Sequence, residues 1–366
     1  MKRVIYTNDP QLEIWSLLGL FESKKIVYDK LKLKYPSLSE DGLITRTDEI
    51  TYSVRQAREF FSASDQTSLL TRPLLLSYGM LNLGKALVCY KSSEDTNFEN
   101  YFMSHGLKFM PSTGDQELAN ESIKIKDKGT YPELAAIYNQ QAYPNVEINL
   151  KDLLSQIPDL AEMFSIVYKE HPNVVSLKVD KYGYLIEDLG EYFEQFNEKI
   201  KATEPYLRDN KVEMYITGIK ENIIRIDTAF ERLGVVKTLK HLDLSLSSIS
   251  GVDYFRVFTL INSEPIILKE ASIHYLIIFS YGMLSRYQSS RWGKYIDPNL
   301  SGEAEIINKS IQVGKIRYLH LLVSYLFEEE FQFSNSIEKP EESVDYEEIK
   351  RRLKIDAERD KRRGPL

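Results

Sequence analysis

The sequence predicts a mainly α-helical fold with a mixed α/β middle segment, that is, an α+β protein. Apolar residues recur at three- and four-residue steps toward both ends of the chain, which is the period of amphipathic helices. Two runs, residues 74–90 and 273–284, are apolar on most sides and therefore predict buried helices. Short runs in the middle alternate between apolar and polar residues, which is typical of half-buried strands.

Composition bounds the organisation of the chain. Of its 366 residues, 43% are hydrophobic and 28% are charged, as in globular proteins, so it can fill one large domain or two ordinary ones. We expect an N-terminal helical part (residues 1–106), a mixed α/β segment (107–265), a C-terminal helical part that packs on the N-terminal part (266–333) and a charged, flexible tail (334–366).

Helices follow one another through the N-terminal part. Asp9 and Pro10 are an N-cap and a proline at the first helical position, and they begin the first predicted helix. Pro73 begins the apolar helix, which should be buried because so little of it is polar. The helices expected before it cover residues 10–21, 23–34 and 47–64.

The middle segment should contain a small sheet with helices on one side. Its period-two pattern exposes one face of each strand and buries the other. Strands are expected at residues 122–126, 146–150, 175–179 and 213–216, and helices at residues 150–168 and 189–201.

Helices return in the C-terminal part, at residues 269–291 and 302–330. The apolar pattern stops after Phe333, and the tail that follows is rich in Glu, Lys and Arg. Favourable i,i+4 pairs such as Glu347 with Arg351 predict a charged helix in this tail. With little apolar surface of its own, it should dock weakly or bind a protein partner.

An apolar pentad occurs twice, as Ser77-Tyr78-Gly79-Met80-Leu81 and as Ser280-Tyr281-Gly282-Met283-Leu284. Glycine inside a helix costs about 1 kcal/mol relative to alanine, so its presence suggests that another backbone comes close. We expect the two pentad helices to pack together, with each glycine facing the other helix. The alternative is a coincidence between two buried helices.

Five sequence blocks carry a family resemblance. They are Ala57-Arg58-Glu59-Phe60-Phe61, residues 71–83, His105-Gly106-Leu107, residues 281–287, and Arg291-Trp292. In this order they resemble the signature blocks of the YaaC-like family, which tends to have a proline where this chain has Gln288-Ser289-Ser290. The resemblance implies a bacterial, intracellular protein with a role in defence against phage or in stress, and it implies no particular substrate.

Basic residues border the two apolar helices. A guanidinium group beside apolar segments must find an anion or another acceptor. If the two helices run antiparallel, the start of one meets the end of the other, and these residues could line one ligand-binding site. The expected site residues are Arg58, Arg72, Lys85, Arg286, Arg291 and Trp292. The ligand would carry phosphate, as a nucleotide or a nucleic acid does, and His105 is the candidate proton donor.

Structural ion pairs are the alternative interpretation of these arginines, with Glu49, Glu59 and Asp65 as candidate partners. Our leading functional hypothesis is a non-catalytic, accessory or sensing component of a defence or stress system that binds the phosphate-bearing ligand or a protein partner. The alternative is a metal-independent nuclease, similar to HEPN effectors, that uses His105 and arginines. The close arginine–histidine spacing of those effectors does not occur here.

Other chemistry finds no support in the sequence. Residues 79–86 imitate a phosphate-binding loop, but Ala86 replaces the hydroxyl residue and the segment is predicted to be helical. The five histidines are isolated and Cys89 is the only cysteine, so we expect neither a metal site nor a cofactor. The start of the chain lacks the apolar stretch of a signal peptide, and the apolar runs are too short to span a bilayer. These features predict a cytoplasmic protein.

Overall fold

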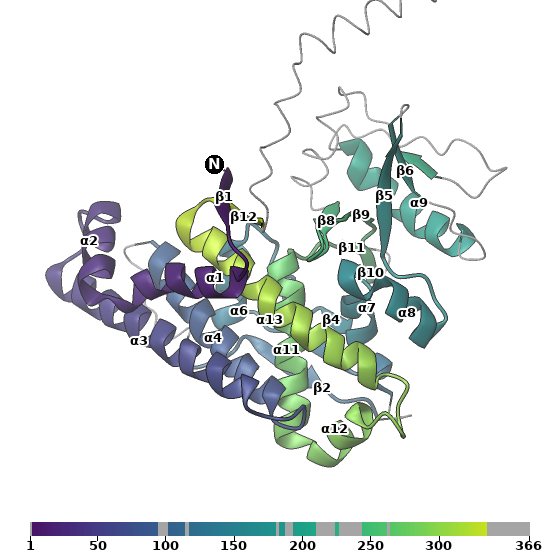
Figure 1. Cartoon of the computed structure of the whole chain (residues 1–366), viewed down its shortest axis with the longest axis horizontal. Helices are drawn as coiled ribbons and strands as arrows, with labels where there is room; N and C mark the ends of the chain where they lie inside the picture. The colour runs from purple at the N-terminus through teal and green to yellow at the C-terminus, as the bar shows by residue number, and fades with distance from the viewer. Residues whose placement is uncertain are drawn as a thin grey trace, which may run out of the picture.

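The computed structural model describes residues 2–93, 102–113, 117–180, 183–186, 193–209, 224–226, 244–261 and 264–334. Helices dominate both ends of the described chain, and small sheets lie mainly in the middle, as the sequence predicts (Figure 1). The strand predicted at 213–216 and the tail beyond Ser334 lie outside the described residues. Among the described residues, no helix combines the length and the apolar character needed to cross a membrane.

The N-terminal helices begin at capping residues. α1 (Pro10–Gly19) begins where the Asp9 carboxylate accepts a hydrogen bond from the Leu12 amide, at 3.0 Å. α3 begins earlier than the predicted residue 47, because the Ser39 hydroxyl caps its first turn. The other elements of this part are η1 (Leu20–Glu22), α2 (Lys24–Lys34), α3 (Glu40–Asp65) and α4 (Arg72–Lys91). The sequence that imitates a phosphate-binding loop lies inside α4, so it forms no loop.

Three helices form the C-terminal part: α11 (Glu270–Tyr287), α12 (Ser289–Ile296) and α13 (Ala304–Phe327). The single helix predicted for residues 269–291 is wrong, because Gln288 leaves the helical conformation and divides it. α11 packs against both α4 and α13, and α13 also contacts α4 (Figure 1). α4, α11 and α13 each contribute fully buried residues to the core, for example Leu83, Ile278 and Leu322.

The strands of the middle segment belong to separate sheets, so the prediction of one small sheet is wrong. β2 (Leu107–Met110), β3 (Ser122–Ile125) and β4 (Glu147–Asn149) form an antiparallel sheet. A second antiparallel sheet has the order β7-β6-β5-β9-β8. Its strands are β5 (Val174–Asp180), β6 (Gly183–Ile186), β7 (Ile224–Ile226), β8 (Ser245–Ser247) and β9 (Asp253–Arg256). The predicted strands at 122–126, 146–150 and 175–179 correspond to β3, β4 and β5.

Short helices and a hairpin connect these strands. Pro158 divides the helix predicted at 150–168 into separate pieces, since proline cannot donate a backbone hydrogen bond. These pieces are α7 (Leu150–Leu154), η3 (Pro158–Leu160) and α8 (Ala161–Tyr168). The remaining elements are η2 (Leu118–Asn120), α6 (Thr130–Ile137), α9 (Phe193–Asp209) and the hairpin of β10 (Thr259–Ile261) with β11 (Glu264–Ile266).

A parallel pair of strands joins the first described residues to the end of α13. β1 (Lys2–Tyr6) pairs with β12 (Glu330–Ser334), with Arg3 opposite Phe331 (Figure 1). Neither strand is predicted by the sequence. Parallel strands this far apart in the chain leave no hairpin signal in the sequence.

α4 and α11 run antiparallel. Ser285, near the end of α11, donates to the backbone carbonyl of Leu70, just before α4. Gly282, one turn earlier on α11, faces Ser77 and the carbonyl of Pro73, which lie further along α4. Residues closer to the start of α11 therefore contact residues further along α4, as in an antiparallel pair.

The two pentad glycines have different neighbours. A Cβ at Gly282 would lie 2.5 Å from the Ser77 hydroxyl oxygen and 3.4 Å from the Pro73 carbonyl oxygen, so this glycine permits the approach of α4. A Cβ at Gly79 would lie 2.7 Å from the ring of Phe61, on α3. The expectation that each glycine faces the other pentad helix is therefore wrong for Gly79.

Replacing Gly282 with alanine should lower the free energy of unfolding by about 1–3 kcal/mol, because the new Cβ overlaps Ser77. Gly293→Ala is the matched control: Gly293 lies inside α12, and nothing lies within 4 Å of a Cβ added there. Because alanine has a higher helix propensity than glycine, Gly293→Ala should leave the free energy of unfolding unchanged or raise it by up to about 1 kcal/mol. Urea unfolding followed by circular dichroism measures both variants. A Gly282→Ala protein as stable as the wild type would contradict the close packing.

Candidate functional site

Arg58 and Arg72 stabilise the N-terminal helices. Arg58 forms an ion pair with Glu22 and donates a hydrogen bond to the carbonyl oxygen of Trp15 at 2.8 Å. Arg72 donates to the carbonyl oxygens of Ser64 and Thr67, at 3.1 and 2.7 Å. It thereby satisfies acceptors at the end of α3, where helical carbonyls lack partners.

Arg291 and Trp292 lie on α12, and both bind groups of other segments. Arg291 lies 3.1 Å from the carboxylate of Glu121, whose side chain has 0% exposure. It also donates to the carbonyl oxygen of Ser112 at 3.0 Å. Trp292 is fully buried, and its indole N–H donates to the carbonyl oxygen of Leu69 at 2.9 Å. Trp292 therefore attaches α12 to the start of α4, and its side chain has no exposed surface.

In the described chain, Arg58, Arg72, Arg286 and Arg291 share no hydrogen-bond or ion-pair partner that would join them at one site. The four guanidinium groups bind four different sets of partners, and the two carboxylates among these partners belong to different segments. The carboxylates that pair with these arginines are Glu22 and Glu121, and not Glu49, Glu59 or Asp65, which the sequence suggested. Asp65, for example, forms an ion pair with Lys315.

The positive charges of Lys85 and Arg286 both act on His105 and lower its pKa, and we call these three residues the basic cluster. Tyr78 and Lys85 lie seven positions apart on α4, so they share one face of that helix, and Phe279 and Arg286 are related in the same way on α11. An N–H of Arg286 donates to the Tyr78 hydroxyl at 2.6 Å. His105 packs its ring on Phe279, with 5.3 Å between ring centroids.

The backbone fixes the position of His105 in this cluster. Its carbonyl oxygen accepts a hydrogen bond from the Tyr131 amide at 3.0 Å, at the start of α6. The next residue, Gly106, has φ +75°, a conformation that side chains rarely adopt. Lys85 lies nearby, and its ammonium is 5.3 Å from the centroid of the Phe102 ring.

The electrostatics of the basic cluster keep His105 neutral near pH 7. Burial lowers the pKa of His105, and the positive charges of Lys85, Arg286 and Lys126 lower it further. Its Nδ1 atom is buried and has no hydrogen-bond partner among the described residues. Within the same residues, neither Lys85 nor Arg286 forms an ion pair. The cluster therefore carries positive charge that no carboxylate in the described chain neutralises.

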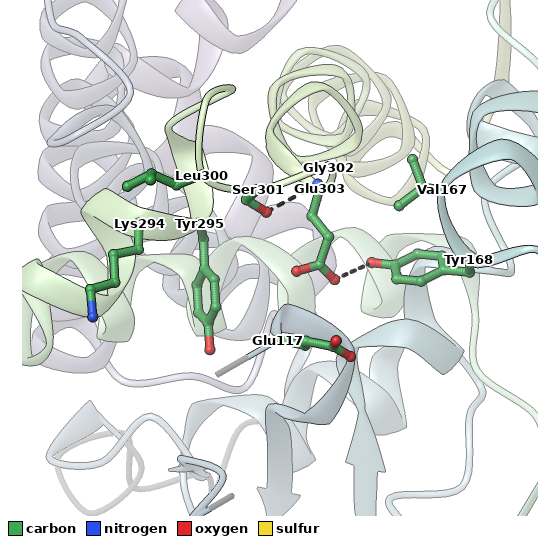
Figure 2. A pocket seen from close by; sticks show the side chains of 9 residues that line it. All are labelled: Glu117, Val167, Tyr168, Lys294, Tyr295, Leu300, Ser301, Gly302 and Glu303. Carbon is green, nitrogen blue, oxygen red and sulfur yellow. Dashed lines mark hydrogen bonds between the residues drawn. The ribbon is translucent and has the colours of Figure 1, made fainter. Parts of the chain in front are cut away.

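A cavity of about 520 Å³ lies at the other end of α12, and the sequence analysis did not predict it. Three distant segments form its wall: the end of α8, the residue before η2, and the stretch from α12 to the start of α13. Figure 2 shows their side chains around the space. The lining residues are Glu117, Val167, Tyr168, Lys294, Tyr295, Leu300, Ser301, Gly302 and Glu303.

Glu303 is the buried carboxylate of this cavity, with 8% of its surface exposed. It accepts hydrogen bonds from the backbone amides of Leu118 and Ala119, at 2.8 and 3.1 Å, and from the Tyr168 hydroxyl at 2.9 Å (Figure 2). Burial raises its pKa, these three donors lower it, and the charge of Glu117 raises it again, with a net rise. All three donors are neutral groups.

The carboxylate behind the cavity wall is compensated differently. Glu121 accepts a hydrogen bond from the Tyr295 hydroxyl at 2.7 Å and pairs with Arg291. The residues of this region escaped sequence reasoning because isolated Glu and Tyr residues carry no motif. The available signal was the string Ser301-Gly302-Glu303, at the start of the helix predicted for residues 302–330. Among the described residues, no group of three or more His, Cys, Asp or Glu is placed to hold a metal ion.

Fold and site together define the class: a mainly α-helical protein with small sheets, a basic cluster between two buried helices and a carboxylate-lined cavity. The sequence matches the family model of the YaaC-like protein over residues 19–326, so the chain belongs to the YaaC-like family. No curated protein and no solved structure gave a match. The comparisons therefore assign a family and no activity.

Arg291→Ala should lower the free energy of unfolding by about 3–5 kcal/mol, because it leaves Glu121 buried without its cation. Arg286→Ala removes an exposed guanidinium group and should cost less than about 1 kcal/mol. Chemical unfolding of the two variants measures this difference. Equal losses would mean that the Glu121–Arg291 pair contributes nothing specific to stability.

Proposed function

We propose that the protein is a non-catalytic, cytoplasmic component of a bacterial defence or stress system that binds a phosphate-bearing ligand at the basic cluster. The observation that supports this most is the basic cluster: Lys85 and Arg286, from two separate helices, both place positive charge near the buried His105. The assignment to defence or stress rests on the family resemblance.

The chemistry of the three side chains suits a phosphate group. Arg286 offers planar guanidinium donors and Lys85 a compact charge, and both types of group bind phosphate oxygens in proteins. Tyr78 holds Arg286 from one side and leaves its other donors for a ligand. An anion would also relieve the repulsion among the positive charges around His105. The ligand class we propose is a nucleotide or the end of a nucleic acid.

Binding is favoured over the alternative of a metal-independent nuclease. A histidine that acts as a general acid or base usually has a partner on its second ring nitrogen, which fixes the tautomer and orientation of the ring. The Nδ1 atom of His105 has no such partner among the described residues. Incubation with RNA and DNA in EDTA tests this choice, because cleavage that His105→Ala abolishes would favour the nuclease.

Arg286→Ala should weaken the binding of nucleotides or short oligonucleotides by about 1.5–3 kcal/mol, or roughly 10- to 100-fold, because one charged donor is lost. Isothermal titration calorimetry measures this effect. Lys25→Ala is the matched control, since it removes one positive charge from an exposed position on α2. Identical titrations of wild type and Arg286→Ala, or no binding by the wild type, would refute the proposed site.

The affinity for an oligonucleotide should rise as the pH falls from about 7.5 to 5.5. Free His105 has a pKa below its usual value of about 6.5, whereas a bound anion favours the protonated ring and raises that pKa. Binding therefore takes up a proton in this pH range. A phosphodiester ligand avoids titration of the phosphate itself. His105→Gln should flatten the profile, and an unchanged slope in that variant would remove His105 from the site.

A further inference from the structure

The cavity of Figure 2 shares no lining residue with the basic cluster and differs from it in charge. We propose that this cavity is a second binding site, which takes a small organic cation with an ammonium or guanidinium group. The carboxylates of Glu117 and Glu303 would hold the charge, and the rings of Tyr168 and Tyr295 would pack on the carbon atoms of the ligand. The inference does not depend on the proposed phosphate site.

The charge of Glu303 is the first argument. Two other carboxylates, the buried Glu121 and the largely buried Glu270, each lie next to an arginine, Arg291 and Arg317 respectively. Glu303 is also nearly buried, yet its three hydrogen-bond donors are neutral. A buried carboxylate is stabilised most by a nearby cation, because opposite charges attract strongly where water is excluded.

The wall of the cavity provides the second argument. Its charged residues are two acids, Glu117 and Glu303, and one base, Lys294, so the lining is acidic on balance. Lys294 and Glu117 are exposed at the surface, whereas Glu303 is not. A cation entering the cavity would therefore be attracted toward the buried end, where Figure 2 shows Glu303 beside Tyr168.

The size and aromatic content of the cavity provide the third argument. Its volume of about 520 Å³ falls within the ~300–1,000 Å³ of small-molecule pockets. Two tyrosines, Val167 and Leu300 supply apolar surface beside the carboxylates. Aromatic rings next to an acidic group attract organic cations through their negative faces. The site therefore suits an alkylammonium or alkylguanidinium compound better than a bare metal ion.

The test uses n-butylammonium as the probe and butyrate, of similar size and opposite charge, as the control ligand. Saturation-transfer NMR with the full-length protein at low salt should detect binding of n-butylammonium and none of butyrate. Glu303→Gln should weaken binding by about tenfold or more, since it removes the buried charge. A thermal melt of this variant checks that it remains folded.

Two exposed positions keep the test independent of folding. Glu117→Gln should weaken binding by up to about fivefold, and Lys294→Gln should strengthen it by a similar factor, because exposed charges contribute modestly. Arg286→Ala, which alters the basic cluster, should leave the affinity for n-butylammonium unchanged. Preference for butyrate, absence of binding at millimolar n-butylammonium, or no opposite effect of Glu117→Gln and Lys294→Gln would overturn the proposal.

Discussion

The antiparallel contact between α4 and α11 positions both candidate sites. Gly282 allows the two helices to approach, because a side chain at that position would overlap α4. The contact places Arg286 of α11 against Tyr78 of α4, whose hydroxyl accepts a hydrogen bond from its guanidinium group. It continues into α12, where Trp292 binds the backbone just before α4. With α12 attached in this way, Tyr295 lies in the wall of the cavity.

Buried carboxylates determine how the C-terminal helices are held. Burial raises the pKa of Glu270, but Arg317 and His274 more than reverse this effect and bring the pKa well below its usual range. Arg317 makes two hydrogen bonds to Glu270, at 2.6 and 2.7 Å, and thereby joins α13 to the start of α11. Glu303, at the start of α13, is held by neutral donors and keeps a raised pKa. α13 therefore begins at a carboxylate, Glu303, that has no arginine beside it in the described chain, whereas Glu270 at the start of α11 is paired with Arg317 of α13.

The sequence was informative where structure depends on nearby residues. Apolar periodicity located the helices, and alternation located β3, β4 and β5, because both patterns record which side of one element is buried. The sequence did not predict several contacts between residues that lie far apart along the chain. The parallel pairing of β1 with β12 and the contact of Arg291 with Glu121 are of this kind. Of the expected site residues, Lys85 and Arg286 both lower the pKa of His105, and the packing of His105 on Phe279 places it beside α11.

The two sites also show why the net charge of −7 does not identify a ligand. Electrostatic attraction depends on local arrangement, and distant surface charges are screened over about 8–10 Å at physiological salt. The charges that lower the pKa of His105 are positive, whereas the charge of Glu117, which raises the pKa of Glu303, is negative. α11 and α12 are separated only by Gln288, yet they contribute to sites of opposite sign. Two consecutive helices therefore contribute to surroundings of opposite charge.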